Sequence, residues 1–435
     1  MRTLSLVDCI ELKFSGNILK NAICFGDCDN DGLNELILGN SSGELAIFRD
    51  ERCICASSEL GTIAALAVGD LLNIGRNVLV VVNIEGWCHI FDVETEINSY
   101  QKQDEVDGPL QCLPIDYCLI WPFHSQRIPP NTKTLHVGDI NQDGLTEMIV
   151  GLTDRVLRTY QWRIEPQSDY PDDKHLSKSD EREDDTKSDI SEAYEGRLIG
   201  LNKWEFANQI GSVALHKVDQ VCSIIVGQPG GTVTQISERK RPASIGTNVA
   251  SAGSTLFADN ETLSGSQNSK PPSSQDHVSV IRNESPSDNI LIQYHPLDVK
   301  HMQNPNISTE VTGNVVSSDG KECHSYGVAT VDGTIIIARD NVIERSVQVD
   351  NQILSLHQVN GKVLACSWNG DTYLIDRKDE VRFHFEDSVA AFVAGSYAMQ
   401  DDNFTSEHKL FNRNCLVYVT FQERVYVYPV DIPCK

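Results

Sequence analysis

The most constraining feature of this 435-residue sequence is a hairpin-like segment that occurs seven times. Each copy has a run of aliphatic and β-branched residues, a short turn and a second, alternating run, in most copies with an aromatic residue. Alternation on both sides of a short turn predicts two antiparallel strands. The copies are Glu35–Phe48, Val78–Phe91, Glu147–Trp162, Ser223–Ile236, Tyr326–Ala338, Val363–Asp376 and Leu416–Tyr428.

Glycine lies in five of the seven turns, where it supplies the positive φ that a tight hairpin turn needs. Copies three and seven have Asp154-Arg155 and Glu423-Arg424 instead, which predicts turns of another type. The five glycines are Gly43, Gly86, Gly230, Gly333 and Gly370.

The spacing of the copies indicates one four-stranded unit per repeat. Turn glycines are 43 residues apart in the first pair (86 minus 43) and 37 apart in the fifth pair (370 minus 333). A propeller blade takes roughly 40 to 50 residues. A small, apolar strand precedes most hairpins and a weaker strand follows, as expected for the innermost and outermost strands of a blade. The expected inner strands are Ala22–Phe25, Ile63–Val68, Thr134–Val137, Ser212–Leu215, Ile353–Leu356 and Ala390–Val393.

The predicted fold is therefore an all-β, seven-bladed β-propeller in a single domain, residues 1–435. Blade seven has only three strands at the C-terminal end, and Leu4–Phe14 reads as a lone strand before blade one. We expect this strand to complete blade seven, which would close the ring and remove exposed sheet edges.

Two segments do not fit the repeat. Residues 167–195 are rich in Asp, Glu, Lys and Ser, and residues 238–289 are rich in Ser, Asn, Pro and Gly. Neither carries enough apolar side chains to offset the entropy of ordering, so both are predicted to be disordered insertions.

Composition limits the partners and the compartment. The formal net charge is −26, and such acidity disfavours nucleic acid and anionic membranes as partners. No run of about 18 apolar residues is present, which predicts no membrane insertion. The first residues are too polar for a signal peptide, and the 13 cysteines form no Cys-x-x-Cys pair. The expected compartment is the cytoplasm, with the cysteines as packing residues.

Two loops between first and second strands are rich in carboxylates. Gly26–Leu36 and Gly138–Met148 place oxygen-bearing side chains at alternate positions, then a glycine, then a glutamate. Calcium and other hard cations prefer such oxygen ligands, so these loops are candidate Ca²⁺ sites. The candidate ligands are Asp27, Asp29, Asp31 and Glu35 in blade one, and Asp139, Asn141, Asp143 and Glu147 in blade three.

A structural alternative applies to the same loops, because Asp side chains shape turns by accepting backbone N–H bonds. The corresponding loop of blade two keeps Asp70 but has Leu72 and Ile74 at ligand positions. It is predicted to bind no cation.

The loops resemble the FG-GAP repeat of integrin-alpha propellers, whose pattern is Asp-x-Asp-x-Asp-Gly-x-x-Asp. The departure is a glutamate, Glu35 or Glu147, at the last position. The chain is further similar to an intracellular branch of that superfamily. The similarity includes the blade-two run from Glu85, Leu152–Arg155, Ser346–Asp350, Ser367–Asp376, Cys415–Phe421 and Val425–Tyr428.

The resemblance implies a scaffold subunit of the KICSTOR complex, recruited to the lysosomal membrane surface. Its partners would be the other KICSTOR subunits and the GATOR complex, and its effect would be to restrain target-of-rapamycin signalling. The alternative is a calcium-binding adhesion or lectin-like propeller, which would require secretion.

Enzymatic function is not expected, because the sequence has no nucleophile elbow, phosphate-binding glycine loop or His-Glu-x-x-His motif. His89, His136 and His357 lie in strand-like runs and are interpreted as packing residues. Trp87 and Trp368 adjoin turns, and the expectation is that both are buried between blades.

Overall fold

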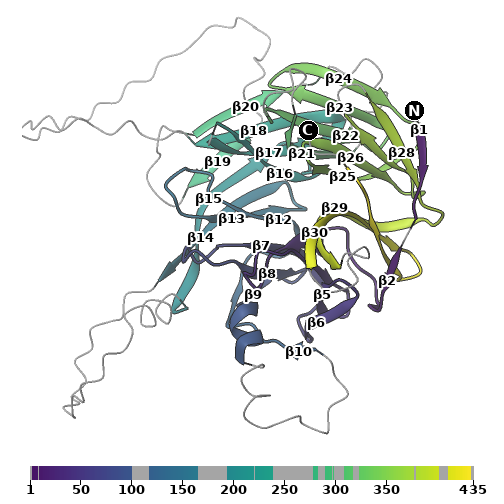
Figure 1. The fold of residues 1–435 in the computed structure, drawn as a ribbon. Coiled ribbons are helices and arrows are strands. Elements are labelled where there is room, and N and C mark those ends of the chain that lie inside the picture. The colour runs from purple at the N-terminus through teal and green to yellow at the C-terminus, as the bar shows by residue number, and fades with distance from the viewer. Residues whose placement is uncertain are drawn as a thin grey trace, which may run out of the picture.

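The computed structural model describes residues 2–7, 9–99, 117–164, 194–219, 221–238, 278–282, 290–295, 297, 308–316, 323–376, 379–400 and 410–432. These residues form seven separate sheets arranged around a common axis, as Figure 1 shows. The predicted seven-bladed propeller is thereby confirmed. None of the helices within the described ranges has the length and apolarity needed to cross a bilayer.

The innermost strands surround the central channel. Each contacts the inner strand of the next blade, and β29 of blade seven contacts β3 of blade one, which closes the ring. The prediction located six of the seven and missed β21, whose sequence TEVTGNV is mostly polar or small. The inner strands are β3 (Ile23–Gly26), β7 (Ile63–Gly69), β12 (Thr132–Gly138), β16 (Val213–Val218), β21 (Thr309–Val315), β25 (Ile353–Val359) and β29 (Val389–Gln400).

All seven predicted hairpins are present and antiparallel. The second strand of each blade is largely buried, because a neighbouring blade covers it on either side, although β30 is buried only from Cys415 onward. The second and third strands are β4 (Glu35–Gly39) with β5 (Leu45–Arg49), β8 (Val78–Asn83) with β9 (Trp87–Phe91), β13 (Glu147–Leu152) with β14 (Val156–Ile164), β17 (Val221–Gln228) with β18 (Thr232–Glu238), β22 (Ser325–Thr330) with β23 (Thr334–Arg339), β26 (Lys362–Ser367) with β27 (Thr372–Ile375), and β30 (Leu410–Thr420) with β31 (Val425–Pro429).

The turns of blades three and seven differ from the prediction. Arg155 and Glu423 have φ values of 73° and 63°, in the region that the turn glycines occupy. The Glu423 N–H donates to Thr420 O at 3.1 Å, as the Gly43 N–H does to Asn40 O at 3.2 Å. The prediction of another turn type is therefore wrong: the same turn forms, with a side chain in a conformation that glycine adopts more easily.

The outer strands complete each blade. Blade seven is completed by β2 from the N-terminal segment, as predicted. The expectation of one continuous strand over Leu4–Phe14 is wrong, because β1 pairs in parallel with β28 and becomes a fifth strand of blade six. The outer strands are β6 (Arg52–Ser57), β11 (His124–Arg127), β15 (Gly196–Phe206), β20 (Ile290–His295), β24 (Val342–Gln348), β28 (Glu380–His384) and β2 (Ile10–Leu12), with β1 at Arg2–Ser5.

Two further strands extend blades one and three. β10 (Cys118–Leu119) pairs with β6, and β19 (Val278–Arg282) pairs with β15. The second pairing corrects the prediction for 238–289, because its alternating run Val278-Ser-Val-Ile supports a strand. The rest of that segment lies outside the described residues, apart from Glu238 at the end of β18. The same is true of 167–195 apart from Tyr194 and Glu195.

Close approach between blades explains the glycine that precedes each acidic loop. A Cβ on Gly26 would lie 2.5 Å from Cβ of Val68 in β7, and one on Gly69 would lie 2.8 Å from Val137 Cγ1 in β12. A Cβ on Gly138 would lie 2.7 Å from Leu215 Cδ1 in β16. The Gly-Asp pair of the repeat therefore combines a packing requirement with the first residue of the loop.

Candidate functional site

The three acidic loops share one backbone arrangement, which is organised by their first aspartate. Asp27 accepts hydrogen bonds from the N–H groups of Asp31 at 3.1 Å and Gly32 at 3.0 Å. In blade two, Asp70 accepts from Ile74 at 3.0 Å and Gly75 at 2.8 Å. Because the blade-two loop lacks the other ligands, this conformation does not depend on a cation.

The blade-three loop follows the same plan. Asp139 accepts from the Gly144 N–H at 3.1 Å, and Asp143 accepts from the Leu145 N–H at 2.7 Å. Asp27 and Asp139 thus have a structural role, whether or not a metal is present.

A role that sequence reasoning missed belongs to the fourth loop position. Asn30, Asn73 and Gln142 there have positive φ values of 62°, 60° and 60°. Asn30 Oδ1 accepts from the Asn77 N–H at 2.7 Å, and Asn73 Oδ1 accepts from the Thr146 N–H at 2.5 Å. The loops of blades one and two are therefore each hydrogen-bonded to the loop of the next blade. In blade three, Gln142 Nε2 donates to Glu238 O at the end of β18 in blade four, at 3.3 Å. These contacts help to hold the ring together.

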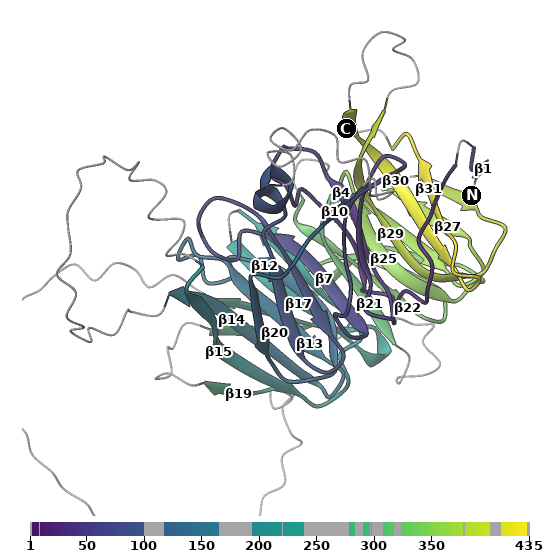
Figure 2. The ribbon, with the colours of Figure 1, turned by 90° about the horizontal axis from the view of Figure 1, so that it is seen from below.

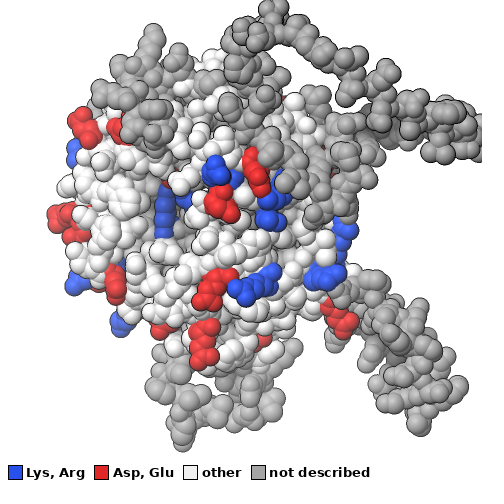
Figure 3. All heavy atoms as spheres, turned by 180° about the vertical axis from the view of Figure 1, so that it is seen from behind, with Lys and Arg blue, Asp and Glu red and all other residues white. Residues whose placement is uncertain are grey.

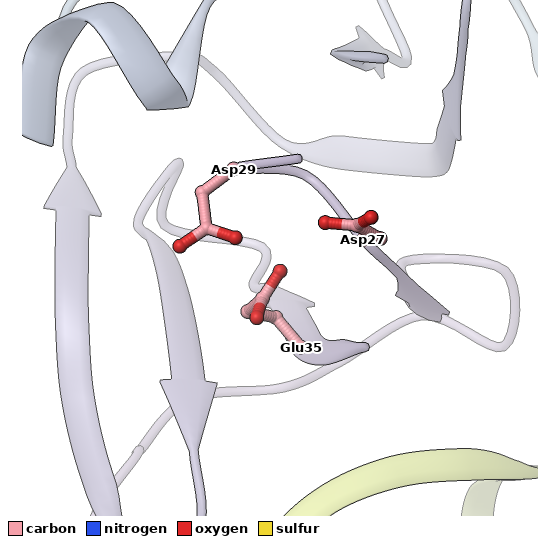
Figure 4. Close-up of side chains that lie close together, drawn as sticks. All are labelled: Asp27, Asp29 and Glu35. Atoms are coloured by element: carbon pink, nitrogen blue, oxygen red, sulfur yellow. The ribbon is translucent and has the colours of Figure 1, made fainter. Parts of the chain in front are cut away.

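The candidate ligands of blade one surround an arginine. Asp27, Asp29 and Glu35 each place an oxygen within 4.8 Å of the others, and their side chains point toward one another in Figure 4. Arg49, directly across the hairpin from Glu35, has Nη2 at 2.7 Å from Asp29 Oδ2 and at 2.5 Å from Glu35 Oε1. Its Nη1 lies 3.0 Å from Asp31 Oδ2.

The guanidinium group of Arg49, from β5, supplies the positive charge among the blade-one carboxylates. Glu35 is fully buried, and burial raises its pKa to about 7, while the hydrogen bond and charge of Arg49 act in the opposite direction. Burial likewise raises the pKa of Asp29. A metal ion at this site would have to displace the guanidinium group from three carboxylates.

Blade three places a neutral residue where blade one has arginine. Glu147 pairs across the hairpin with Gln161. Instead of a guanidinium group, the Asn141 side-chain amide donates to Glu147 Oε1 at 2.9 Å and to Asp143 Oδ2 at 3.0 Å. Asn141 therefore bridges Glu147 and Asp143, and among the residues that the structure describes no arginine or lysine forms a salt bridge with the blade-three carboxylates.

The carboxylates of the blade-three loop have no positively charged partner among the described residues. Glu147 is fully buried, and burial raises its pKa to about 8, helped by the charges of Asp143, Asp139 and Glu238 and opposed by the Ile140 N–H. Within the described part of the chain, Asp139 Oδ1 is buried without a hydrogen-bond partner, as is Asp29 Oδ1 in blade one. An oxygen-rich site without an internal cation fits a hard divalent ion better than the arginine-filled site of blade one.

The histidines expected to be packing residues include two in the inner strands. His136 Nε2 donates to Val213 O at 2.7 Å and His357 Nε2 donates to Phe392 O at 3.0 Å, in each case across to the next blade. Burial lowers the pKa of both side chains, to about 4 for His357. They are neutral links between blades.

The inner strands also line a cavity of about 420 Å³ in the channel. Lys20 and Glu310 lie on its wall and form an ion pair at 2.6 Å. On the face in Figure 3, basic and acidic side chains are interspersed and form no continuous basic patch.

The exposure of two tryptophans differs from the prediction. Trp87 and Trp368 are 39% and 41% exposed, so the expectation that both are buried is wrong. Both lie at hairpin turns, at the ends of the sheets and not between their faces.

The family model of integrin-alpha FG-GAP repeat-containing protein 2 matches residues 47–432. The chain is 32% identical over 447 residues to the mouse (Mus musculus) KICSTOR complex protein ITFG2, covering 98% of this chain and 85% of that protein. It is 30% identical over 450 residues to the cattle (Bos taurus) protein of the same name, covering 98% and 71%.

Solved structures with the same architecture are much more distant in sequence. The structure of BBS1N in complex with ARL6DN matches with a TM-score of 0.53 and 11% identity, covering 99% of this chain and 98% of that chain. The WD40 propeller of Doa1 matches with a TM-score of 0.50 and 7% identity, covering 98% and 97%. These likenesses concern the fold, whereas the family model and the two mammalian relatives concern descent. The chain belongs to the family of integrin-alpha FG-GAP repeat-containing protein 2.

Proposed function

We propose that this protein is a non-enzymatic scaffold subunit of a KICSTOR-like complex. The observation that carries the proposal is the identity of 32% and 30% to two proteins named as KICSTOR complex proteins, which extends over 98% of the chain. A match of that extent includes all seven blades and not only the repeat motif. In this role the propeller recruits the GATOR complex to lysosomes and restrains target-of-rapamycin signalling when nutrients are scarce.

The architecture is compatible with such a role. A closed ring presents loops from seven blades on a rigid frame, and loops on rigid frames are common binding surfaces. The candidate acidic residues are engaged by Arg49, by backbone N–H groups or by Asn141, which are structural roles.

The test combines purification with a signalling measurement. The tagged protein should co-purify with the other KICSTOR subunits and with GATOR. Cells depleted of it should keep target-of-rapamycin signalling high during amino-acid starvation, and re-expression should restore the shut-off. Normal shut-off together with no co-purification would contradict the proposal.

We also propose a divalent cation, with Ca²⁺ as the first candidate, at the blade-three loop. The supporting observation is the buried Glu147 beside the partnerless Asp139 oxygen, without the arginine that fills the corresponding place in blade one. Asp139, Asn141, Asp143 and Glu147 would hold the ion, which would supply positive charge to the loop.

A further inference from the structure

Blades six and seven place two aromatic side chains together on the surface. Trp368 follows β26 and Phe421 follows β30, the second strands of blades six and seven, so the two residues occupy equivalent turn positions in neighbouring blades. Trp368 is 41% exposed and Phe421 is 59% exposed. Their ring centroids are 6.2 Å apart and their planes differ by 15°, a stacked arrangement. Figure 2 shows β27 and β31 of these blades near each other.

The aromatic pair stands on a rigid base. The Trp368 N–H donates to Gln352 O at 3.1 Å, and Trp368 O accepts from the Val389 N–H at 2.9 Å. Blades six and seven also share the stacked rings of Phe385 and Tyr418, which are buried and have centroids 4.5 Å apart. A surface that is already ordered loses little conformational entropy when a partner binds.

Exposed carboxylates border the pair. The loop from blade six to blade seven carries Glu386 and Asp387, both exposed. This loop lies against the Trp368 turn, because a Cβ on Gly370 would be 2.4 Å from Phe385 O and 2.7 Å from Asp387 O. Glu423, in the same turn as Phe421, adds a third exposed carboxylate.

The cations of this region are held mainly by other groups. Arg382 lies 2.6 Å from Asp371, and His384 lies 2.8 Å from the same carboxylate. Arg424 donates to Tyr426 Oη at 3.3 Å and lies 3.9 Å from Glu11, and the charge of Asp387 also acts on it. Among the residues that the structure describes, none forms a salt bridge with Glu386 or Asp387. The surface around the rings therefore carries an excess of negative charge.

We propose that Trp368, Phe421, Glu386 and Asp387 form a docking surface for a basic segment of a partner protein. An Arg or Lys side chain of that segment lies against the exposed rings, and its charge faces the two carboxylates. Aromatic faces attract cations, and this attraction strengthens when carboxylates lie beside the rings. The central aromatic residues supply the binding energy, and the carboxylates select for positive charge.

This inference goes beyond the proposed function, because it specifies the face of the propeller and the chemistry of the bound segment. Its test needs only the purified chain and peptides. A failure here would leave membership of a KICSTOR-like complex unaffected, and a failure of that membership would leave this surface unaffected.

The experiment begins with a phage library of random dodecapeptides selected on the purified full-length chain. The affinities of selected peptides are then measured by fluorescence anisotropy for four proteins: the wild type, Trp368→Ser/Phe421→Ser, Glu386→Lys/Asp387→Lys, and the control Ile84→Ser/Trp87→Ser. The control changes residues that are 42% and 39% exposed at the equivalent turn of blade two. Thermal unfolding of all four proteins establishes that the variants are folded.

The expected peptides have Arg or Lys beside an apolar residue. Both blade-six/seven variants should bind them about tenfold more weakly or worse, and the control should bind like the wild type. Binding should weaken between about 50 and about 300 mM salt. Acidic or uncharged peptides, equal binding to all four proteins, or no selected peptide would overturn the proposal. Self-association of the wild type in sedimentation, lost in Trp368→Ser/Phe421→Ser, would also overturn it, because the occupant would then be a second copy.

Discussion

Glu35 and Glu147 occupy the same position in blades one and three, opposite Arg49 and Gln161 respectively. Both carboxylates are buried, and both have a raised pKa, first because of burial. In blade one, a guanidinium group from the same sheet compensates the charge. In blade three, the described chain supplies Glu147 with neutral donors, the Asn141 side-chain amide and the Ile140 N–H. Two loops with nearly the same sequence therefore differ in their need for an external cation.

Replacing Arg49 should destabilise the protein. Arg49→Met would remove the cation shared by Asp29, Asp31 and Glu35 and leave buried carboxylates unpaired. Breaking such a partly buried network should lower the free energy of unfolding by about 2–4 kcal/mol, which urea denaturation measures. The matched control is Arg424→Met at an exposed pair, where solvent screens the charges, so little change in the free energy of unfolding is expected. Equal losses in both variants would contradict the assigned role of Arg49.

Calcium titration should distinguish the two loops. Isothermal calorimetry on the wild type is expected to show weak binding of one Ca²⁺, because the blade-three carboxylates lack an internal cation. Asp143→Ala should abolish the heat, and Asp31→Ala should leave it nearly unchanged. If calcium and magnesium both give no heat with the wild type, the acidic loops are structural turns in both blades.

At the residue scale, the sequence predicted the loop carboxylates but not their partners. The spacing of Asp27, Asp29 and Asp31 is local, so the pattern is visible along the chain. Arg49 is 14 residues from Glu35, and its contact depends on the register across the hairpin. Counting back symmetrically from the turn would have paired these residues, and the same count would have paired Glu147 with Gln161. Exposure of Trp368 was not predictable, because it depends on where the neighbouring blade ends.

Among the elements, the inner strands are joined by side chains as well as by packing. His136 and His357 each donate a hydrogen bond to a carbonyl oxygen in the inner strand of the next blade. His216 in β16 accepts a hydrogen bond at Nδ1 from the Asn314 N–H of β21 at 3.0 Å. Burial lowers the pKa of all three, to about 4 for His216 and His357. Their neutral forms therefore belong to the folded ring.

Acidification should weaken these links. An unfolded histidine binds a proton near pH 6.5, whereas His357 in the folded ring does so only near pH 4. Between pH 6.5 and pH 4 the unfolded state thus binds more protons than the folded ring. The contribution of His357 to the stability of the fold is therefore present above pH 6.5 and lost as the pH falls toward 4.

The measurement is urea denaturation at pH 7 and pH 5 for the wild type and His357→Asn. The wild type should lose roughly 1–2 kcal/mol more than the variant on acidification. Buried Glu35 and Glu147 oppose this trend, since their raised pKa values favour the folded state at lower pH. The difference between the two proteins cancels that contribution. A wild type and variant with the same pH dependence would contradict the assignment.

Strands with continuous apolar runs were predictable, and those without were not. All seven hairpins and six inner strands follow from local pattern. In β21, polar residues and Gly313 separate the apolar residues, so its hydrophobic pattern is weak. β1, β10 and β19 add to blades that are distant along the chain, and no local signal indicates which sheet they join. The turns at Arg155 and Glu423 show that the blade imposes its turn even where glycine is absent.

On the scale of the molecule, two short segments near the start of the sequence secure two neighbouring blades. β2 pairs Ile10 with Val427 in blade seven, and β1 pairs Arg2 with Val381 in blade six. Leu12 of β2 is 3% exposed, and the Phe14 ring lies 6.3 Å from that of Phe48 in blade one. The segment that completes blade seven also packs on blade one.

Deletions should separate the roles of these two strands. Removing residues 2–14 takes away β2 and opens blade seven, and it should lower the midpoint of thermal unfolding by about 10 °C or more. Removing only residues 2–7 takes away the added strand of blade six and should cost a few °C at most. Differential scanning calorimetry makes the comparison. Unchanged unfolding after the longer deletion would contradict the ring closure.

The pairing of Ile10 with Val427 also sets the order of events during synthesis. A ribosome adds about 5–20 residues per second, so β2 leaves it on the order of 20–80 s before its partner strand exists. Blade seven cannot form in that interval, and the inner strands of blades one and six lack their common neighbour. The nascent ring therefore stays open during this interval, with an unpaired strand edge. Such an edge is prone to aggregation, against which chaperones protect. A premature stop before residue 410 would leave it open permanently.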